Sequence, residues 1–464
     1  MSAPRIPRVA TLSTLDAFRR HLDAIGADLT VDDAVAVDGP LARPVEIRDA
    51  TAGVLGAPNR FVALPMEGWD ASDDGGPTDL VRRRWERIGA SDCGLVWMEA
   101  TAVRPDGRAN PNQLVLSEAT APAFAELRSL LASDQIAGLQ LTHSGRYCRP
   151  GAPRIAYRHP FLDQRVAVDE RSVLTDDELD ELVEDYVRAA VLAHRAGFDF
   201  VDIKHCHGYL LHELLSSFGR PGRYGGDLGG RTSFLRSVVE RVRDRVPELA
   251  LAVRVSVFDL VPFTKGSDNV GVPEAKTGYG YAFGGDGTGV GVDLTEAHAF
   301  LEIVSSLGIG LVCTTAGSPY YTPHIQRPAY FPPSDGYLPP EDPLLGVARQ
   351  IDATAELARA HPSLVIVGSG YSYLQDWLPN VAQAVVSGGA SMIGLGRMML
   401  AYPTLASDVL AGRPLQRGSI CRTFSDCTTA PRNGLVSGCY PFDPFYKERP
   451  ERKRLLELNK GRRT

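Results

Sequence analysis

The sequence has no apolar run as long as a membrane-spanning helix requires, which argues against a membrane protein. It also has no excess of basic charge. A net charge of -7 and a pI near 5.9 argue against a nucleic acid or a membrane surface as partner. The first 29 residues are charged and amphipathic and lack the apolar core of a secretory signal, so we expect no such signal.

Cysteine is scarce and odd in number, with seven residues in 464. Three of them, Cys93, Cys206 and Cys313, lie in strand-like runs, which fits a reducing compartment better than a disulfide scaffold. We therefore expect an acidic protein of the cytoplasm whose partner is a small-molecule substrate. Whether it forms a homo-oligomer is left open.

Strand-like and helical patterns alternate from Phe61 onward, and this alternation sets the fold class. Eight strands are predicted, at Phe61–Pro65, Cys93–Glu99, Ile136–Leu141, Phe198–Ile203, Leu249–Val255, Ile309–Thr314, Leu364–Val367 and Met392–Leu395. Helical patterns follow them, at 79–88, 121–131, 176–196, 210–218 with 233–246, 294–307, 344–360, 374–387 and 404–410. Eight β-α units joined by right-handed crossovers predict an α/β fold, a (β/α)8 TIM barrel.

Three regions flank or interrupt this pattern. We predict an N-terminal extension at 1–45 with one helix (Leu12–Ile25), the barrel at 46–415, and a cysteine-containing C-terminal tail at 416–464. A Gly-rich stretch at 258–292 shows neither helical nor strand period, and a Pro- and aromatic-rich stretch follows at 317–342. Long loops on a barrel commonly carry function, so we expect these two to roof the substrate pocket together.

The richest chemistry follows the predicted strand at Phe198–Ile203. Its end carries Lys204, His205, His207 and Tyr209, and the loop P-G-R-Y-G-G-D-L-G-G-R comes after the next helical pattern. Barrel enzymes place their catalytic side chains at the C-terminal ends of the strands. This cluster is therefore the predicted centre of the chemistry.

The segment K-H-C-H-G-Y-L with Y-G-G-D-L-G-G-R resembles the signature of the old yellow enzyme family of NADH:flavin oxidoreductases. Further matching motifs come in the family's order: N-R-F-V-A-L-P-M-E at 59–67, G-P-T-D-L at 76–80, E-A-T at 99–101, Q-L-T-H-S-G-R at 140–146, R-V-S at 254–256, G-S-G at 368–370 and G-L-G-R at 394–397. The resemblance implies a flavin mononucleotide (FMN) cofactor, reduced by NADH or NADPH.

The resemblance assigns cofactor contacts to residues spread over the barrel. The ring would rest on Leu64, Pro65, Met66, Glu67 and Ala100. Gln140 and Arg254 would bond its pyrimidine edge, although alone they read as a strand-end amide and a structural ion pair. Gly368, Ser369, Gly370, Gly396 and Arg397 follow the last two predicted strands, where barrels commonly bind phosphate. Glycine lets backbone N–H groups approach, and Arg397 adds a planar cation.

The resemblance also implies the catalytic set. Lys204 and His207 match the pair that donates hydrogen bonds to a substrate oxygen, and Tyr209 matches the proton donor. Lys204 departs from the family, which has histidine there. A full cation favours substrates that carry or develop negative charge, or alternatively the reduced flavin. Glu67 is a second departure, and it would pair with Lys204 in either a structural or a catalytic role.

The predicted activity is hydride transfer between nicotinamide-reduced flavin and an activated C=C of a small carbonyl compound, or the reverse dehydrogenation or aromatisation. An amine dehydrogenase or demethylase is the alternative, because Trp69, Tyr320 and Tyr321 would supply an aromatic cage. Lys204 argues against it, since it would repel a cationic amine. A barrel that binds flavin or an anion without turnover is the third reading.

The tail carries Cys421, Cys427 and Cys439. It resembles the iron–sulfur region that follows the first domain in the 2,4-dienoyl-CoA reductase and trimethylamine dehydrogenase group, with ligands lost. Phe424 stands where a second cysteine would be. Because a [4Fe–4S] centre takes four thiolates and three are local, we predict no metal here.

Overall fold

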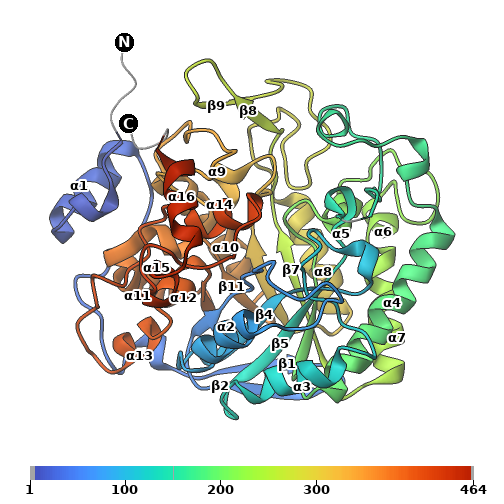
Figure 1. Cartoon of the computed structure of the whole chain (residues 1–464), viewed down its shortest axis with the longest axis horizontal. Helices are drawn as coiled ribbons and strands as arrows, with labels where there is room; N and C mark the ends of the chain where they lie inside the picture. The colour runs from blue at the N-terminus through green and yellow to red at the C-terminus, as the bar shows by residue number, and fades with distance from the viewer. Residues whose placement is uncertain (1–5, 150, 461–464) are drawn as a thin grey trace.

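The computed structural model describes residues 6–149 and 151–460, so the outermost residues of the two predicted terminal segments lie outside the described part. Eight parallel strands close into a barrel with the order β10-β11-β12-β3-β4-β5-β6-β7 (Figure 1). Their bounds are β3 Phe61–Ala63, β4 Leu95–Ala102, β5 Ile136–Thr142, β6 Phe200–Ile203, β7 Ala250–Ser256, β10 Leu311–Thr315, β11 Val365–Gly368 and β12 Met392–Leu395. The predicted (β/α)8 barrel is confirmed.

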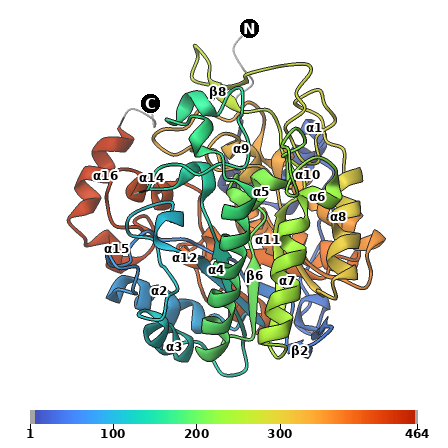
Figure 2. The same cartoon turned by 90° about the vertical axis from the view of Figure 1, so that its right-hand side faces the viewer.

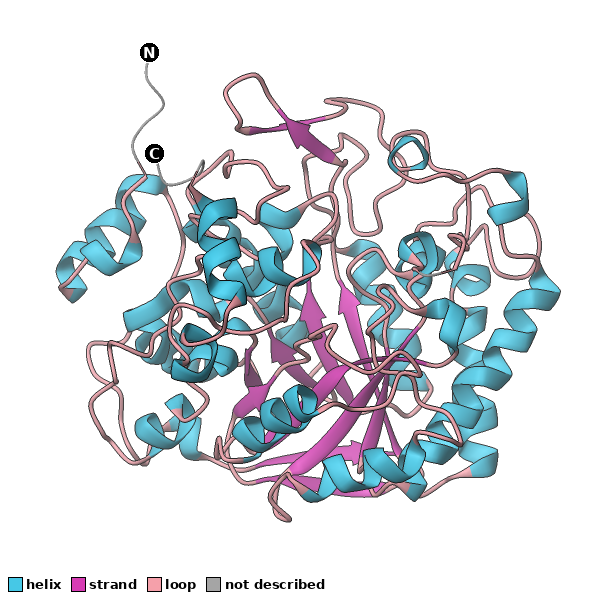
Figure 3. Cartoon of the chain, in the orientation of Figure 1, coloured by secondary structure: helices cyan, strands magenta, loops and turns pink. Residues whose placement is uncertain are grey.

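Helices surround the barrel on its outside, as Figure 3 shows in cyan around the magenta strands. They are α2 Asp79–Gly89, α3 Ala121–Ser129, α4 Asp176–Arg195, α5 Leu210–Leu215, α6 Leu228–Arg231, α7 Ser233–Arg245, α8 Thr295–Ser306, α10 Pro343–Ala360, α11 Leu378–Ser387, α12 Arg397–Ala401 and α13 Leu405–Leu410. Short 3-10 helices are η1 Val9–Thr11, η2 Pro40–Ala42, η3 Pro105–Gly107, η4 Gly145–Tyr147, η5 Asp163–Arg165, η6 Glu170–Ser172 and η7 Tyr371–Trp377.

Local sequence explains the longest of these helices, α4. Thr175 and Glu178 form a reciprocal capping box at its start, where the side chain of each accepts a backbone N–H of the other. Its apolar face is buried against α7, and Tyr186 meets Phe234 edge-on with ring centres 5.4 Å apart (Figure 2). Capping and burial of one apolar face together hold the helix against the barrel.

The barrel interior is filled by side chains at its N-terminal end. Trp97 and Phe200 meet edge-on with ring centres 5.1 Å apart. A Cβ at Gly138 would lie 2.0 Å from Cζ of Phe200, so only glycine fits there. A hairpin of β1 (Val45–Asp49) and β2 (Gly53–Ala57) packs on this core from below (Figure 1). Our prediction missed this hairpin, although V-E-I-R-D alternates in the two-residue period of a half-buried strand.

Three further predictions need correction. The stretch 258–292 contains an antiparallel hairpin, β8 (Phe263–Lys265) with β9 (Gly271–Pro273), whose strands are too short to show a period. The helix predicted at 374–387 is instead the end of η7 followed by α11, because Gln375 inside η7 has a left-handed φ of 54° that interrupts a regular helix. In the extension, α1 (Leu15–Ile25) begins three residues later than predicted, at its cap Thr14.

The C-terminal tail folds back on the open end of the barrel (Figures 1 and 2). It contains α14 (Asp426–Arg432), α15 (Pro444–Lys447) and α16 (Glu451–Asn459), and α9 (Pro323–Gln326) lies in the loop that it covers. Ser425 donates to the carbonyl of Phe331, and Arg432 forms a bidentate pair with Asp335. The tail is thereby tied to the loop that follows β10.

Candidate active site

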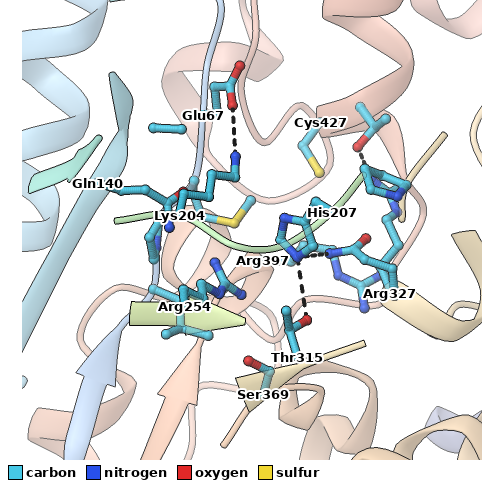
Figure 4. A pocket seen from close by; sticks show the side chains of 18 of the residues that line it. Glu67, Gln140, Lys204, His207, Arg254, Thr315, Arg327, Ser369, Arg397 and Cys427 are labelled. Atoms are coloured by element: carbon cyan, nitrogen blue, oxygen red, sulfur yellow. Dashed lines mark hydrogen bonds and ion pairs between the residues drawn. The ribbon is translucent and has the colours of Figure 1, made fainter. Parts of the chain in front are cut away.

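One cavity lies at the C-terminal ends of the barrel strands, where the predicted site residues meet (Figure 4). It encloses about 1140 Å³ of empty space, counted to its open mouth. The predicted residues that line it are Leu64, Pro65, Met66, Glu67, Trp69, Ala100, Gln140, Lys204, His207, Tyr209, Arg254, Tyr320, Ser369, Gly370, Gly396 and Arg397. We call this space the main cavity. Of the predicted site residues, Gly368 and Tyr321 do not line it.

The side of the main cavity formed by β5, β6 and β7 carries a buried polar network. Asp202 accepts hydrogen bonds from Gln140 Nε2 at 2.5 Å, from Trp97 Nε1 at 3.0 Å and from the backbone N–H of Arg254 at 2.7 Å. Burial raises the pKa of Asp202 to about 6. The Nε of Arg254 is buried and has no hydrogen-bond partner among the described residues.

The opposite side, at the ends of β11 and β12, is built to receive an anion. Ser369 and Gly370 follow β11, and Gly370 has φ 97°, a conformation that favours glycine. Arg397 starts α12 and is 8% exposed. Its Nη2 donates to the carbonyl of Pro328 at 2.8 Å, whereas its Nη1 is buried without a partner in the described part of the chain. A buried cation with free donors is costly unless an anion joins it.

Three side chains from the segment after β6 line the space between these two sides, those of Lys204, His207 and Tyr209. Lys204 Nζ lies 4.0 Å from Oε2 of Glu67 and 3.9 Å from the centre of the Tyr209 ring. Burial lowers the pKa of Lys204, and the neighbouring Glu67 carboxylate opposes that change. The pairing of Lys204 with Glu67 that the sequence predicted is thus present in the geometry.

His207 has a left-handed backbone, with φ 68°. Its Nε2 lies 3.4 Å from Oγ1 of Thr315 and 3.2 Å from Nε2 of Gln326 (Figure 4). Burial, followed by the charges of Arg254 and Lys204, lowers the pKa of His207 well below its usual range. The imidazole is therefore neutral at physiological pH and keeps one N–H donor.

Tyr209 presents its hydroxyl to two oxygens. The hydroxyl lies 3.1 Å from the hydroxyl of Tyr320 and donates to Oε2 of Glu67 at 3.5 Å. Burial and the Glu67 carboxylate raise the pKa of Tyr209 well above its usual value. Tyr209 is thus a phenol at neutral pH, the form that can give up a proton.

The sequence of this chain matches the model of the NADH:flavin oxidoreductase / NADH oxidase family over residues 43–278. The chain belongs to that family. NADPH dehydrogenase of Listeria welshimeri serovar 6b is 34% identical to it over an alignment of 241 residues, gaps included, that covers 47% of this chain and 69% of the relative. NADPH dehydrogenase of Bacillus subtilis is 32% identical over 228 residues, 47% of this chain and 64% of the relative. Family membership makes the chain a flavin oxidoreductase that uses FMN with NADH or NADPH.

Solved structures support the same fold. Histamine dehydrogenase from Rhizobium sp. 4-9 aligns with a TM-score of 0.64 at 21% identity and covers 89% of this chain, which spans 53% of that protein. The old yellow enzyme homologue from Zymomonas mobilis aligns with a TM-score of 0.57 at 22% identity, covering 83% of this chain and 96% of that protein. The chain thus spans about half the length of the histamine dehydrogenase and nearly all of the single-barrel homologue.

The residues present fit the family's cofactor. Free donors on Arg254 and Arg397 lie at two ends of the main cavity, as an anionic phosphate and a polar ring edge require. Ser369, Gly370, Gly396 and Arg397 would hold the phosphate. Since Nε2 of Gln140 already donates to Asp202, Gln140 offers its Oε1 as the acceptor for a ring N–H.

The aromatic wall differs from the prediction. Tyr320 lines the main cavity and stacks on Tyr147 with ring centres 3.7 Å apart. Tyr321 turns away, is 7% exposed, and donates from its hydroxyl to Oδ2 of Asp259 at 2.5 Å. Successive residues of an irregular loop face different ways. The predicted place of Tyr321 in the substrate pocket is therefore corrected: its side chain lies outside the main cavity.

The roof of the main cavity also differs. No residue of 258–292 lines it, whereas Pro319, Tyr320, Gln326 and Arg327 from the other predicted roof loop do. The tail takes the place of the first loop and contributes Cys427, Thr428, Pro431 and Arg432. Arg327 donates to Oγ1 of Thr428, which joins loop and tail across the cavity mouth.

The tail cysteines do not form a recognisable metal site in the part of the chain that the structure describes, where no three His, Cys, Asp or Glu side chains group as ligands. Cys421 and Cys439 are buried, and burial raises the pKa of both thiols. Thiols bind metals far less readily than thiolates. The absence of metal stays a prediction.

Sequence reasoning missed several residues of the site. Asp202 had a signal, a carboxylate inside an otherwise apolar strand pattern, which implies a buried partner. Arg327 had no such signal in the sequence, because a cation in a Pro-rich loop is expected to lie at the solvent-exposed surface. It is held in the cavity wall, and burial and the charge of Arg397 lower its pKa to about 9.

Proposed function

We propose that this flavin oxidoreductase reduces an activated C=C bond in a small carbonyl compound that carries or develops negative charge, or catalyses the reverse dehydrogenation. The observation that carries the proposal is the convergence of Lys204, His207 and Tyr209 in the same cavity as the cofactor-binding residues. An ammonium, a neutral imidazole and a phenol make two donors for a substrate oxygen and one proton donor.

The residues act in sequence on the substrate. Lys204 and His207 hold the carbonyl oxygen and stabilise the negative charge that builds on it as the C=C bond is reduced. The bound flavin, reduced by the nicotinamide, supplies the hydride. Tyr209 then gives the proton of its hydroxyl to the neighbouring carbon. Tyr320 and the tail residues around Pro431 restrict water at the mouth of the cavity.

The cationic cavity supports the preference for anions. Lys204, Arg254, Arg327, Arg397 and Arg432 all line the main cavity, whereas Glu67 is its only acidic lining residue in the described part of the chain. A phosphate accounts for part of this charge. The remainder favours a substrate carboxylate, enolate or phenolate over a neutral molecule.

Amine dehydrogenation is the weaker candidate. A quaternary or protonated amine is held by aromatic faces, and only Trp69 and Tyr320 of the three predicted cage residues line the main cavity. Lys204 would repel the amine at the same place. The structural likeness to histamine dehydrogenase concerns the fold, at 21% identity.

Anaerobic half-reactions test the proposal. The purified yellow protein should be bleached by NADH or NADPH and recolour when an enone, an enoic acid or a cyclohexenone is added. Recolouring should be fastest for compounds that carry a carboxylate. A protein that is bleached but is reoxidised by no alkene would leave only the amine reaction or a non-catalytic flavin barrel.

A further inference from the structure

Glu67 lies in the wall between the main cavity and a second, smaller one. This lateral cavity has about 540 Å³ of empty space, open solvent at its mouth included, and it is bounded by α2 and the tail. Met66, Glu67, Cys427 and Thr428 line both spaces. The other lining residues of the lateral cavity are Arg83, Arg84, Arg87, Ile88, Met399, Leu400, Ser437, Gly438, Cys439, Asp443 and Tyr446.

The lateral cavity reaches the surface, and its wall carries charged groups among apolar ones. The side chains of Arg83 and Arg87 are 24% and 29% exposed, and both pair with Asp443, which is 2% exposed. The space in the lateral cavity that water-sized molecules can occupy is about 60 Å³, more than the roughly 10–15 Å³ that one buried water needs. It can therefore hold a few waters next to Glu67.

The two carboxyl oxygens of Glu67 have different neighbours. Oε1 accepts a hydrogen bond from the indole N–H of Trp69, which fixes the carboxyl group in place. Oε2 faces the active site, 3.5 Å from the hydroxyl of Tyr209 and 4.0 Å from Nζ of Lys204. A buried acid thus contacts the phenol that serves as proton donor.

Tyr209 must recover a proton after each turnover, and its oxygen neighbours are the hydroxyls of Tyr320 and Ser144 and the carboxyl group of Glu67. A serine hydroxyl does not ionise at neutral pH and is no proton source. Tyr320 is a phenol whose own pKa is raised by burial, so it passes a proton on but does not supply one at neutral pH. Burial also raises the pKa of Glu67, an effect that Lys204 opposes. A raised pKa makes a carboxyl group keep its proton to a higher pH than an exposed one, and Glu67 lies within reach of the Tyr209 hydroxyl, so it can return a proton to the phenolate.

We propose that Glu67 is the proton carrier between the lateral cavity and Tyr209, and that the lateral cavity is the route by which protons reach the active site. The inference rests on the proposed alkene reduction. The Tyr209 O–H bond breaks and its proton joins the substrate carbon; the Glu67 O–H bond then breaks and its proton joins the phenolate oxygen. A proton from bulk solvent, relayed along the waters of the lateral cavity, reprotonates the carboxylate, so each relaying water ends as water. These steps transfer protons only, with no oxidation or reduction.

Several charged groups surround the carrier and set its behaviour with pH. The ammonium of Lys204, directly after β6, faces the Glu67 carboxyl group. The thiol of Cys427 in the tail lines the same two cavities. Glu99 of β4 accepts from the backbone N–H of Gly68 and is neutralised by Arg84, which also binds Asp70. Arg83 and Arg87 lie across the lateral cavity, paired with Asp443. Among the residues that the structure describes, Lys204 is the one cation paired with Glu67, and it stabilises the carboxylate and the phenolate alike.

The first test compares Glu67→Gln with Glu46→Gln, an exposed residue of the hairpin below the barrel. Glutamine keeps the shape and accepts from Trp69, but it cannot give up a proton. Reduction of the flavin by NADPH is the internal reference, measured for each variant. Relative to that step, reoxidation by an alkene should slow by about 10²-fold in Glu67→Gln, within the range of general acid catalysis, and keep the parent's ratio in Glu46→Gln. Equal reoxidation rates in the two variants would refute the carrier role.

A second test separates a proton carrier from a structural role. In Glu67→Ala, added formate or acetate should restore alkene reoxidation in proportion to the concentration of its acid form, because a small acid fits the vacated site. The same acids should not rescue Tyr209→Phe. Failure of rescue, together with a lowered melting temperature of Glu67→Ala, would assign Glu67 to structure.

A third readout is independent of turnover. Isotope-edited infrared spectra with 13C-labelled glutamate should show a carboxyl group that stays protonated to a higher pH than the exposed glutamates, and its band should be missing from Glu67→Gln. Filling the lateral cavity with Ser437→Val should slow alkene reoxidation and leave this band in place; normal reoxidation would refute the route. If no alkene reoxidises the reduced parent enzyme, the proposed function fails. If alkenes reoxidise the parent and Glu67→Gln equally fast, only this inference is overturned.

Discussion

Lys204 lies over the ring of Tyr209, with Nζ 3.9 Å from the ring centre. Sequence patterns assign these two residues separate roles, one at the substrate oxygen and one at the substrate carbon. Their contact couples the roles, because the ammonium stabilises the phenolate that proton transfer leaves behind. The change from the family's histidine to Lys204 therefore affects proton delivery as well as substrate charge.

Replacing Lys204 by methionine should weaken the binding of phenolates over the oxidised flavin. Loss of one partner of a buried charge pair costs about 3–5 kcal/mol. The apparent pKa of the bound phenol should rise, since the cation that favours its anion is gone. Absorbance titrations of the charge-transfer band measure both effects. Lys265→Met, at an exposed position of strand β8, is the control. An unchanged phenol pKa would make Lys204 a structural partner of Glu67 alone.

Tyr209→Phe should leave flavin reduction by the nicotinamide intact and slow reoxidation by an alkene by about 10²–10⁴-fold, because only the second half-reaction needs its proton. Stopped-flow absorbance separates the two steps. Tyr186→Phe, a buried tyrosine on α4 at the outside of the barrel, is the matched control. Equal effects on both half-reactions would mean that Tyr209 acts through folding or flavin binding.

Arg397→Ala should lose most of its FMN. Hydrogen bonds to charged groups contribute about 1.5–3 kcal/mol each, which corresponds to roughly 10–150-fold in affinity. Riboflavin lacks the phosphate, so its affinity should be nearly the same in parent and variant. Fluorescence quenching with both flavins measures this, with the exposed Arg359→Ala on α10 as control. If FMN binds the variant as tightly as the parent, the phosphate lies elsewhere.

Asp259 should make the protein less stable as the pH rises from about 4 to about 7. Burial raises its pKa from 3.8 to about 7, so in this range the folded state holds a proton that the unfolded state has released. At about 1.4 kcal/mol per pKa unit, the upper limit of the loss is roughly 4 kcal/mol. Asp259→Asn keeps an acceptor for Tyr321 but should lack this part of the pH dependence.

Urea unfolding of the flavin-free protein across this pH range measures the difference between parent and variant. The exposed Asp33→Asn serves as control. Parallel stability curves for the parent and Asp259→Asn would contradict the assignment.

The tail cysteines should carry no iron. Cys421 and Cys439 are buried thiols whose pKa values are raised, and Cys427 faces the main cavity. Metal analysis of protein purified without oxygen tests this. Several irons per chain, with visible absorbance beyond the flavin bands, would overturn it.

The barrel and much of its site were predictable from local patterns. Strands buried on both faces read as continuous apolar runs, and the polar residues after each run must lie at the same end of a parallel barrel. Gln140, Lys204, Arg254 and Arg397 therefore come together in the main cavity. Their convergence needs no tertiary detail beyond the closure of the barrel.

Other parts of the site depend on contacts between segments far apart in the chain. Arg327 joins Thr428 across 101 positions, and the tail thereby replaces 258–292 as the roof of the main cavity. Tyr320 faces this cavity while Tyr321 binds Asp259, a difference no local period encodes. The sequence by itself determined which backbone elements form and which end of the barrel carries the chemistry, because both follow from hydrophobic periodicity. Only the tertiary structure decided that Glu67 stands between two cavities, since the packing of α2 and the tail around it creates the second one.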